Sequence, residues 1–289
     1  MRLVTPVATA SPPVLVAETT TPTPSAAPAL LLSTSEVFQG GTMLVSVTGS
    51  FEAGTAEFLG RTYALTQGTR SKFTFVPVGV DDPEGEQVLT VNLVLPRGSV
   101  GTIVRDVIVL PTEWALEHIE VVVMEGDLVL DPVARADEEA LLAETFMLWT
   151  LEKLWDGPWL LPVRGPLSSR FGVQRSFNGG PKGGHHGGVD FAAAEGVPVV
   201  ATNGGTVVVA QQLAVRGNMV IIDHGGGVLS GYAHLSTFAV AEGQHVDAGQ
   251  LIAFVGTTGL ATGAHLHWEM SVHGVLVDPL RFTDGTNGF

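Results

Sequence analysis

The feature that most constrains the fold is the alternation of apolar and polar residues in short runs, which glycine, proline and aspartate separate. In "QVLTVNLVLP", Leu89, Val91, Leu93 and Leu95 recur at every second position, which is the pattern of a strand with one buried face. Several such runs in succession predict an immunoglobulin-like antiparallel β-sandwich over residues 30–112. The other runs in this region cover residues 42–49, 55–60, 71–78 and 102–110.

Residues 130–155 form the one segment in which apolar residues change to helical spacing. Asp131 can cap a helix whose first residue is Pro132, because aspartate accepts the free amide hydrogens of a first turn and proline tolerates that position. Gly157 and Pro158 are expected to end the helix. Its apolar stripe is expected to pack between domains and consists of Leu142, Phe146 and Trp149.

The β pattern returns from residue 160, in short runs broken by glycine-rich turns. The chain therefore divides into a β-sandwich domain (30–112), a linker with a helix (113–159) and an antiparallel β domain (160–289). Residues 1–29 contain the tract "TTTPTPSAAPA", which cannot bury a core and predicts a flexible Pro/Thr-rich segment. The residues before this tract do not form a clear signal peptide.

Composition and charge exclude several classes of protein. The 289 residues carry a net charge of −15, and residues 1–163 hold 8 basic and 21 acidic side chains. A chain this acidic, without a basic cluster, binds nucleic acid and anionic membranes poorly, so we expect neither as a partner. The absence of cysteine excludes disulfides, cysteine-ligated zinc and thiol nucleophiles. No apolar run approaches the roughly 18 residues that span a bilayer, so we expect no membrane span in this chain.

Eight of the nine histidines lie in residues 160–289, and two of them, His265 and His267, occur in "GAHLHWEM". Because successive side chains of a strand point to opposite faces, both imidazoles share one surface while Leu266 and Trp268 point away. Two histidines on a solvated strand need no ligand, so this pair alone does not establish a metal or catalytic site.

Two further stretches supply residues for a single site. In "HHGGVD", His186 and Asp190 would lie roughly 13 Å apart in a straight strand, so they can hold one ion only if the chain bends between them. Gly187 and Gly188 permit such a bend. "GYAHLS" adds His234. Two histidines and an aspartate leave a fourth position open for water, as a catalytic zinc ion requires, and two histidines remain for proton transfer and charge stabilisation.

Together these motifs resemble the lysostaphin-type zinc metallopeptidases, which cut peptide bonds in bacterial peptidoglycan. The resemblance covers about residues 160–286, where "SSRFG", "MVIIDHG" and "GQHVDAGQLIAFVGTTG" also match. Ala264 stands where many members have proline and Trp268 where many have phenylalanine, and neither change removes a functional group. The motifs that carry the resemblance are "HGGVD" (186–190), "YAHLS" (232–236) and "TGAHLH" (262–267).

The resemblance implies that His186, Asp190 and His267 bind zinc and that His234 and His265 are the catalytic pair. It implies a zinc-dependent endopeptidase that hydrolyses stem peptides or cross-bridges of peptidoglycan and works outside the cytoplasm, and we expect a monomer. The ion would polarise the scissile carbonyl and activate water, while one catalytic histidine takes a proton and the other stabilises the oxyanion. The residues leave open which histidine has which role.

Two other functions are compatible with parts of the sequence. A noncatalytic cell-wall binding or hydrolase-activator module would keep the fold, although such modules typically lose metal-site residues and this chain has all five. A lipoyl or biotinyl carrier is suggested by "GQHVDAGQLIAFVG" but needs a lysine there, and the last lysine is Lys182, so this function is excluded.

Of the remaining polar residues, we expect His185 in the wall of the site, His224 in a hairpin turn and Glu269 near the two histidines. We expect His245 and His273 to be solvated, and Arg170 and Asn178 to contact substrate or to lie on the surface.

Overall fold

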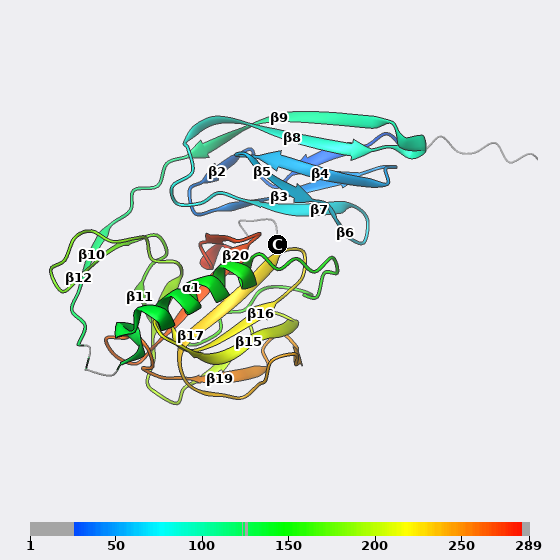
Figure 1. Cartoon of the computed structure of the whole chain (residues 1–289). Coiled ribbons are helices and arrows are strands. Elements are labelled where there is room, and N and C mark those ends of the chain that lie inside the picture. Colours follow the sequence, from blue (N-terminus) through cyan, green and yellow to red (C-terminus); the bar gives the residue numbers. More distant parts are fainter. Residues whose placement is uncertain (1–25, 123, 125–126, 285–289) are drawn as a thin grey trace, which may run out of the picture.

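The computed structural model describes residues 26–122, 124 and 127–284 and is mostly β, as the sequence predicts (Figure 1). Two smaller sheets from the N-terminal half lie on one side of the molecule, and a larger antiparallel sheet lies on the other (Figure 1). Within the described residues, none of the helices has the length and apolar character needed to cross a membrane.

The two N-terminal sheets enclose one apolar core, because the alternating residues of the predicted runs point inward. Leu89, Val91 and Leu93 are buried there, and Leu95 packs against the same core from beyond the end of its strand. The immunoglobulin-like topology stays a prediction. One sheet has the order β1 (Ala29–Leu32), β3 (Thr42–Thr48), β7 (Lys72–Pro77) and β6 (Thr66–Gln67). The other has the order β2 (Glu36–Phe38), β9 (Val100–Leu110), β8 (Gly85–Val94), β4 (Ala53–Phe58) and β5 (Arg61–Ala64), with the 3₁₀ turn η1 (Pro96–Gly98) between β8 and β9.

The predicted helix is α1 (Pro132–Phe146), which follows the 3₁₀ turn η2 (Leu128–Leu130). Its start is confirmed, since the Asp131 carboxylate accepts the backbone N–H of Val133 at 2.8 Å. The helix packs Leu142 and Phe146 onto the large sheet, in a cluster with Met219, Ile221 and Leu229.

The predicted end of this helix, at Gly157 and Pro158, is wrong, because α1 ends at Phe146. Beyond it the backbone bonds to the large sheet instead of continuing the helix: the carbonyl of Thr150 accepts Gly226 N–H at 2.7 Å, and Leu154 N–H donates to the His224 carbonyl at 2.8 Å. Trp149 therefore lies outside the helix and is 45% exposed.

All strand pairs in the large sheet are antiparallel, and its central strands β20, β17 and β16 carry or flank most of the histidine motifs. A short helix, α2 (Leu280–Thr283), follows the last strand. The main path of the sheet is β11 (Leu167–Ser169), β13 (Val189–Ala192), β20 (His265–Val272), β17 (Val228–Phe238), β16 (Gly217–Asp223), β15 (Gly205–Leu213) and β18 (His245–Val246). Off this path lie β14 (Pro198–Val200), β19 (Leu251–Val255) and β21 (Val275–Val277).

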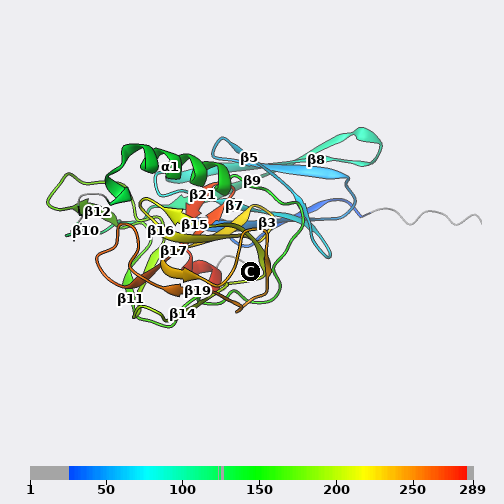
Figure 2. The same cartoon turned by 60° about the horizontal axis from the view of Figure 1, so that its bottom comes forward.

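The segment between the two halves contributes structure of its own. Its strand β10 (Leu116–Ile119) pairs in parallel with β12 (Gln174–Phe177), and both lie at one end of the large sheet (Figures 1 and 2). The two halves also share packing, since Phe73 and Phe75 of β7 contact Trp155 with ring centroids 6.1 and 5.9 Å apart. The domain boundaries at residues 112 and 159 stay predictions.

Candidate active site

Three side chains converge at the start of strands β13 and β20. Asp190 and His267 are direct partners in the register of these strands, and His186 precedes β13. Oδ1 of Asp190 lies 3.1 Å from Nε2 of His186 and 2.8 Å from Nδ1 of His267, and the two nitrogens are 2.9 Å apart. The chain does bend between His186 and Asp190, as their spacing requires, and Gly188 fits because any Cβ there would lie 2.3 Å from the Trp268 carbonyl oxygen.

The nitrogens that point away from this centre have acceptors of their own. Nδ1 of His186 donates to the Arg170 carbonyl at 2.8 Å, which leaves Nε2 with its lone pair toward the centre. Nε2 of His267 lies 3.4 Å from the Glu269 carboxylate, which leaves Nδ1 toward the same point. Such outer contacts select the tautomer in which a histidine binds a metal.

The charges of the cluster favour a cation at its centre. Burial alone would raise the pKa of the Asp190 carboxyl, but its contacts with His186 and His267 outweigh burial and hold that pKa below its ordinary value. Burial lowers the pKa of His186. For His267, contacts with Asp190 and Glu269 outweigh burial and raise the pKa, so a positive charge is stabilised where the three groups meet. The residues therefore fit a divalent metal ion with nitrogen and oxygen ligands.

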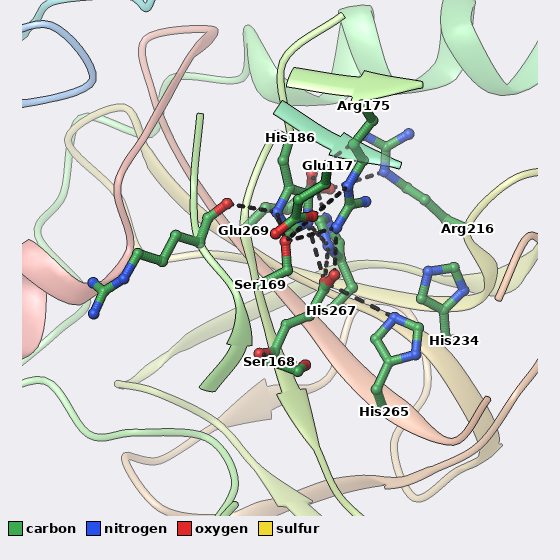
Figure 3. A network of polar contacts seen from close by, with 12 residues as sticks. Glu117, Ser168, Ser169, Arg175, His186, Arg216, His234, His265, His267 and Glu269 are labelled. Carbon is green, nitrogen blue, oxygen red and sulfur yellow. Dashed lines mark hydrogen bonds and ion pairs between the residues drawn. The ribbon is translucent and has the colours of Figure 1, made fainter. Parts of the chain in front are cut away.

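Arg175 of β12 holds the other carboxylate oxygen of Asp190. Its guanidinium donates to Oδ2 at 2.5 Å and to the Ser169 hydroxyl at 3.1 Å. Ser169 in turn donates to Glu117 of β10 at 2.8 Å. Oδ1 of Asp190 thus remains the oxygen that faces the two histidines. Figure 3 shows Arg175, Ser169 and Glu117 beside His186 and His267.

His234 and His265 lie side by side next to this cluster, with ring centroids 4.7 Å apart (Figure 3). His234 has a positive φ of 59°, and the register of β17 against β16 shifts so that Ala233 and His234 lie opposite the single residue Met219. This is a β-bulge, which turns a side chain away from the regular alternation. The bulge directs His234 toward His265, which belongs to a different strand.

Both imidazoles present the same nitrogen to the site. Nδ1 of His234 donates to the Thr258 carbonyl and Nδ1 of His265 to the Gly263 carbonyl, each at 2.8 Å. Both Nε2 atoms are then acceptors in the neutral state, and Nε2 of His265 lies 3.9 Å from the Asp190 carboxylate. Burial, followed by the charge of His265, lowers the pKa of His234 to about 3.

A cavity of about 280 Å³ brings all five predicted site residues to one surface. Ile119 and Val121 from the linker, Phe177 of β12 and Leu260 supply apolar lining, and Arg175 and Arg216 are the cations among the lining residues. His185 also lines the cavity, as expected for a wall residue.

A chain of carboxylates and an arginine extends from the site to helix α1. Glu269 is fully buried and accepts the Arg216 guanidinium at 3.1 and 3.2 Å. Burial would raise the pKa of Glu269, but the charge of Arg216 and contact with His267 lower it to about 2. Arg216 also donates to Glu138 of α1 at 3.3 Å. The helix therefore orients the loop at Arg216 and, through Glu269, the ring of His267.

Several other expectations have a clear outcome. His245 is exposed, as expected. The prediction that His273 is solvated is wrong, because its ring lies 3.1 Å from the Thr74 hydroxyl and packs against Tyr63 at a tilt of 46°, between the two halves. His224 lies in the hairpin turn as expected but is fully buried, with its two nitrogens at 2.7 Å from the Gly204 carbonyl and the Ser230 hydroxyl. Asn178 holds Val121 of the linker through both atoms of its side-chain amide.

The sequence reading missed four charged residues of this site: Glu117, Glu138, Arg175 and Arg216. The sequence could have drawn attention to Arg216, because it is a charged residue directly before the apolar strand "GNMVIID". Arg175 follows the matched stretch "SSRFG" by a few residues. Glu117 and Glu138 carry no motif, since their partners lie far away in the sequence.

Comparisons with known proteins identify the family of the domain that holds this site. The sequence profile described as Peptidase family M23 matches residues 184–279. The chain is 45% identical over 95 residues to the "DD-carboxypeptidase/endopeptidase Mpg" of Neisseria meningitidis serogroup B, across 33% of this chain and 22% of that protein. It is 40% identical over 125 residues to the "Murein hydrolase activator NlpD" of Escherichia coli K12, across 43% of this chain and 31% of that protein.

A solved structure described as a peptidase M23 from Pseudomonas aeruginosa is similar over both halves of the molecule. Its TM-score is 0.65 at 26% identity, and the match covers 87% of this chain and 96% of that one. The chain spans less than a third of the length of the two curated relatives. Residues 184–279, which hold all five predicted site residues, are a lysostaphin-type peptidase M23 domain.

Proposed function

We propose that the protein is a zinc-dependent endopeptidase that hydrolyses peptide bonds in the stem peptides or cross-bridges of bacterial peptidoglycan. The observation that carries this proposal is the convergence of His186, Asp190 and His267 on one point, with His234 and His265 facing the same cavity. The similarity to Mpg supports an endopeptidase, and the cell-wall substrate requires a location outside the cytoplasm. The protein acts as a monomer, with peptidoglycan as its partner.

His186, Asp190 and His267 would hold the zinc ion through Nε2, Oδ1 and Nδ1. Three protein ligands are the usual number at a catalytic zinc site, which would keep a further position for water or substrate. When bound, zinc supplies Lewis-acid polarisation of the peptide carbonyl and of an attacking water. Arg175 holds Asp190 so that only Oδ1 faces the centre.

His234 and His265 act on the proton of the attacking water. Each imidazole has its Nδ1 hydrogen bound by a backbone carbonyl, so each Nε2 can accept a proton or a hydrogen bond from water. We assign His265 as the base, because burial lowers the pKa of His234 to about 3 and makes that imidazole the weaker proton acceptor. His234 accepts a hydrogen bond from the water and orients it. The His265 imidazolium then donates its proton to the leaving amine.

The alternative function is a noncatalytic module that activates another cell-wall hydrolase. The similarity to NlpD, whose name describes a murein hydrolase activator, favours it. The two functions differ in whether the purified chain cleaves peptides on its own.

The test is mass spectrometry of muropeptides released from several chemically distinct cell walls by the purified chain. We expect zinc-dependent cleavage of a cross-link, and a loss of about 100-fold or more in rate for His265→Ala and for His234→Ala, with zinc content and circular dichroism unchanged. If the purified chain releases nothing but speeds up an added hydrolase, it is an activator. Normal cleavage by His234→Ala would remove that residue from the mechanism.

A further inference from the structure

We propose that residues 116–122, which are strand β10 and the three residues after it, form one wall of the substrate groove, and that Ile119 and Val121 select peptides with an apolar side chain next to the scissile bond. This inference rests on the proposed function, because it assumes a peptide substrate. Both residues lie outside the matched domain of residues 184–279, yet they line the cavity that holds the catalytic histidines.

The side chains of this segment alternate between the site and solvent. Ile119 and Val121 are partly buried and line the cavity, whereas His118, Glu120 and Val122 are exposed. Val122 is 90% exposed. The segment therefore presents one apolar face to the site, as a strand with period two does.

Hydrogen bonds to Asn178 hold the C-terminal end of this wall in place. Asn178 N–H donates to the Ile119 carbonyl at 2.9 Å, which continues the parallel ladder with β12. The Asn178 side chain accepts from Val121 N–H at 2.8 Å and donates to the Val121 carbonyl at 3.1 Å. Both backbone groups of Val121 are thus bound by one amide, so the position of its side chain is well defined.

A third contact ties the same segment to the candidate metal ligands. Glu117, on the same face as Ile119, accepts the Ser169 hydroxyl at 2.8 Å and lies 3.8 Å from Nε of Arg175. Ser169 and Arg175 both contact residues of the cluster, Ser169 at 3.3 Å from His186 and Arg175 at 2.5 Å from Asp190. The wall is therefore held in register with the reacting centre.

The chemistry of the cavity indicates which side chain it accepts. Arg175 is already paired with Asp190, and Arg216 with Glu138 and Glu269, so neither guanidinium lacks a carboxylate partner. An acidic side chain placed there would lose its hydration without gaining a free cation. The apolar lining, which includes Ile119, Val121, Phe177 and Leu260, instead favours an apolar side chain next to the scissile bond.

The experiment uses the full-length zinc-loaded chain and cross-linked peptides that carry alanine, glycine or glutamate at the residues flanking the scissile bond. The measured quantity is the ratio of kcat/KM for the alanine and glycine peptides. We expect wild-type protein to prefer alanine, with glutamate worst. Ile119→Ala combined with Val121→Ala should lower the alanine-to-glycine ratio about 10-fold, since contact with one methyl group is worth roughly that factor.

Val122→Ala is the matched control, because it removes the same atoms as Val121→Ala from the exposed face, and its ratio should equal that of wild type. Ile119→Val stays informative if the double variant does not fold. It should lower the ratio by a few-fold at most, because it removes one methyl group of the wall. An unchanged ratio in folded, zinc-loaded Ile119→Val and double variants overturns the proposal. So does an equal increase in cleavage of both peptides, which would mean that the segment shields the site.

Equilibrium binding of the same peptides, measured by calorimetry, separates this inference from the proposed function. If wild-type protein binds the peptides without cleaving them, the enzymatic function fails, while the wall is still judged by whether the double variant loses the preference for alanine in binding. If wild-type protein binds alanine and glycine peptides equally, the wall does not select its substrate.

Discussion

The two halves of the molecule are both built from short alternating strands, but they bury different groups. Among the described residues of the N-terminal sheets, the buried polar residues are three threonines, Thr42, Thr66 and Thr74. The buried aspartate, glutamate and histidine side chains all lie at Glu138 or later in the chain. Burying an ionisable group costs several kcal/mol unless a partner offsets it, and the half that carries this cost is the half that holds the candidate active site.

Substitutions in the two halves should differ most in their effect on zinc content and cleavage, and the largest effect is expected when a candidate zinc ligand is removed. Asp190→Ala or His267→Ala should reduce zinc from close to one per chain to a small fraction and reduce cleavage to background, because two remaining ligands hold the ion weakly. Elemental analysis with a muropeptide assay measures both quantities, and circular dichroism checks the fold. Full zinc occupancy in both variants would show that the ligands are other residues.

Removing a core residue of the N-terminal half should change stability and leave the chemistry intact. Leu89 is fully buried between the two sheets, and Leu89→Ala should lower the free energy of unfolding by about 2–5 kcal/mol, from lost burial and the cavity left behind. Zinc content and kcat of the folded protein should match wild type. Urea unfolding and steady-state kinetics test this, and a large loss of kcat at full folding would mean that the halves are coupled more tightly than their separate cores indicate.

The smallest expected effect is the pH dependence of the free energy of unfolding. We expect this dependence to come from the C-terminal half, which contains the buried His224. Burial lowers the pKa of His224 from its ordinary 6.5 to about 4, so its neutral form is favoured in the folded state. The unfolded chain then binds a proton that the folded chain does not, and stability contributed by His224 is full above pH 6.5 and falls as the pH drops toward 4, by up to about 3 kcal/mol.

The measurement for His224 is the free energy of unfolding in urea between pH 7 and pH 4.5. His224→Gln should show a shallower loss of stability than wild type over this range, whereas Leu89→Ala should lose stability with the wild-type slope. Equal slopes for wild type and His224→Gln would mean that other groups cause the acid sensitivity.

Local patterns were enough to predict the mostly β fold and the start of the helix, whereas the zinc-binding and catalytic roles of the five cavity residues stay predictions. Strand alternation placed His265 and His267 on one face, and both line the cavity. The spacing of His186 and Asp190 required a bend, and the bend is present. These predictions succeeded because each depends on a few neighbouring residues.

Features that depend on distant partners could not be predicted in the same way. The bulge at His234 arises from the pairing of β17 with β16, and the end of α1 is decided by backbone bonds to Gly226 and His224. Glu117 reaches Ser169 only because β10 pairs with β12. No pattern within either segment records such a contact.

Strand β10 also limits how this domain can be exchanged between genes. A recombination breakpoint between residues 122 and 167 would deliver the five site residues to a new host protein but leave Glu117, Ile119 and Val121 behind. The transferred domain would carry its ligands without the strand that contacts Ser169 and Arg175. A unit that kept these contacts would have to begin before Leu116 and would therefore be longer than the matched residues 184–279.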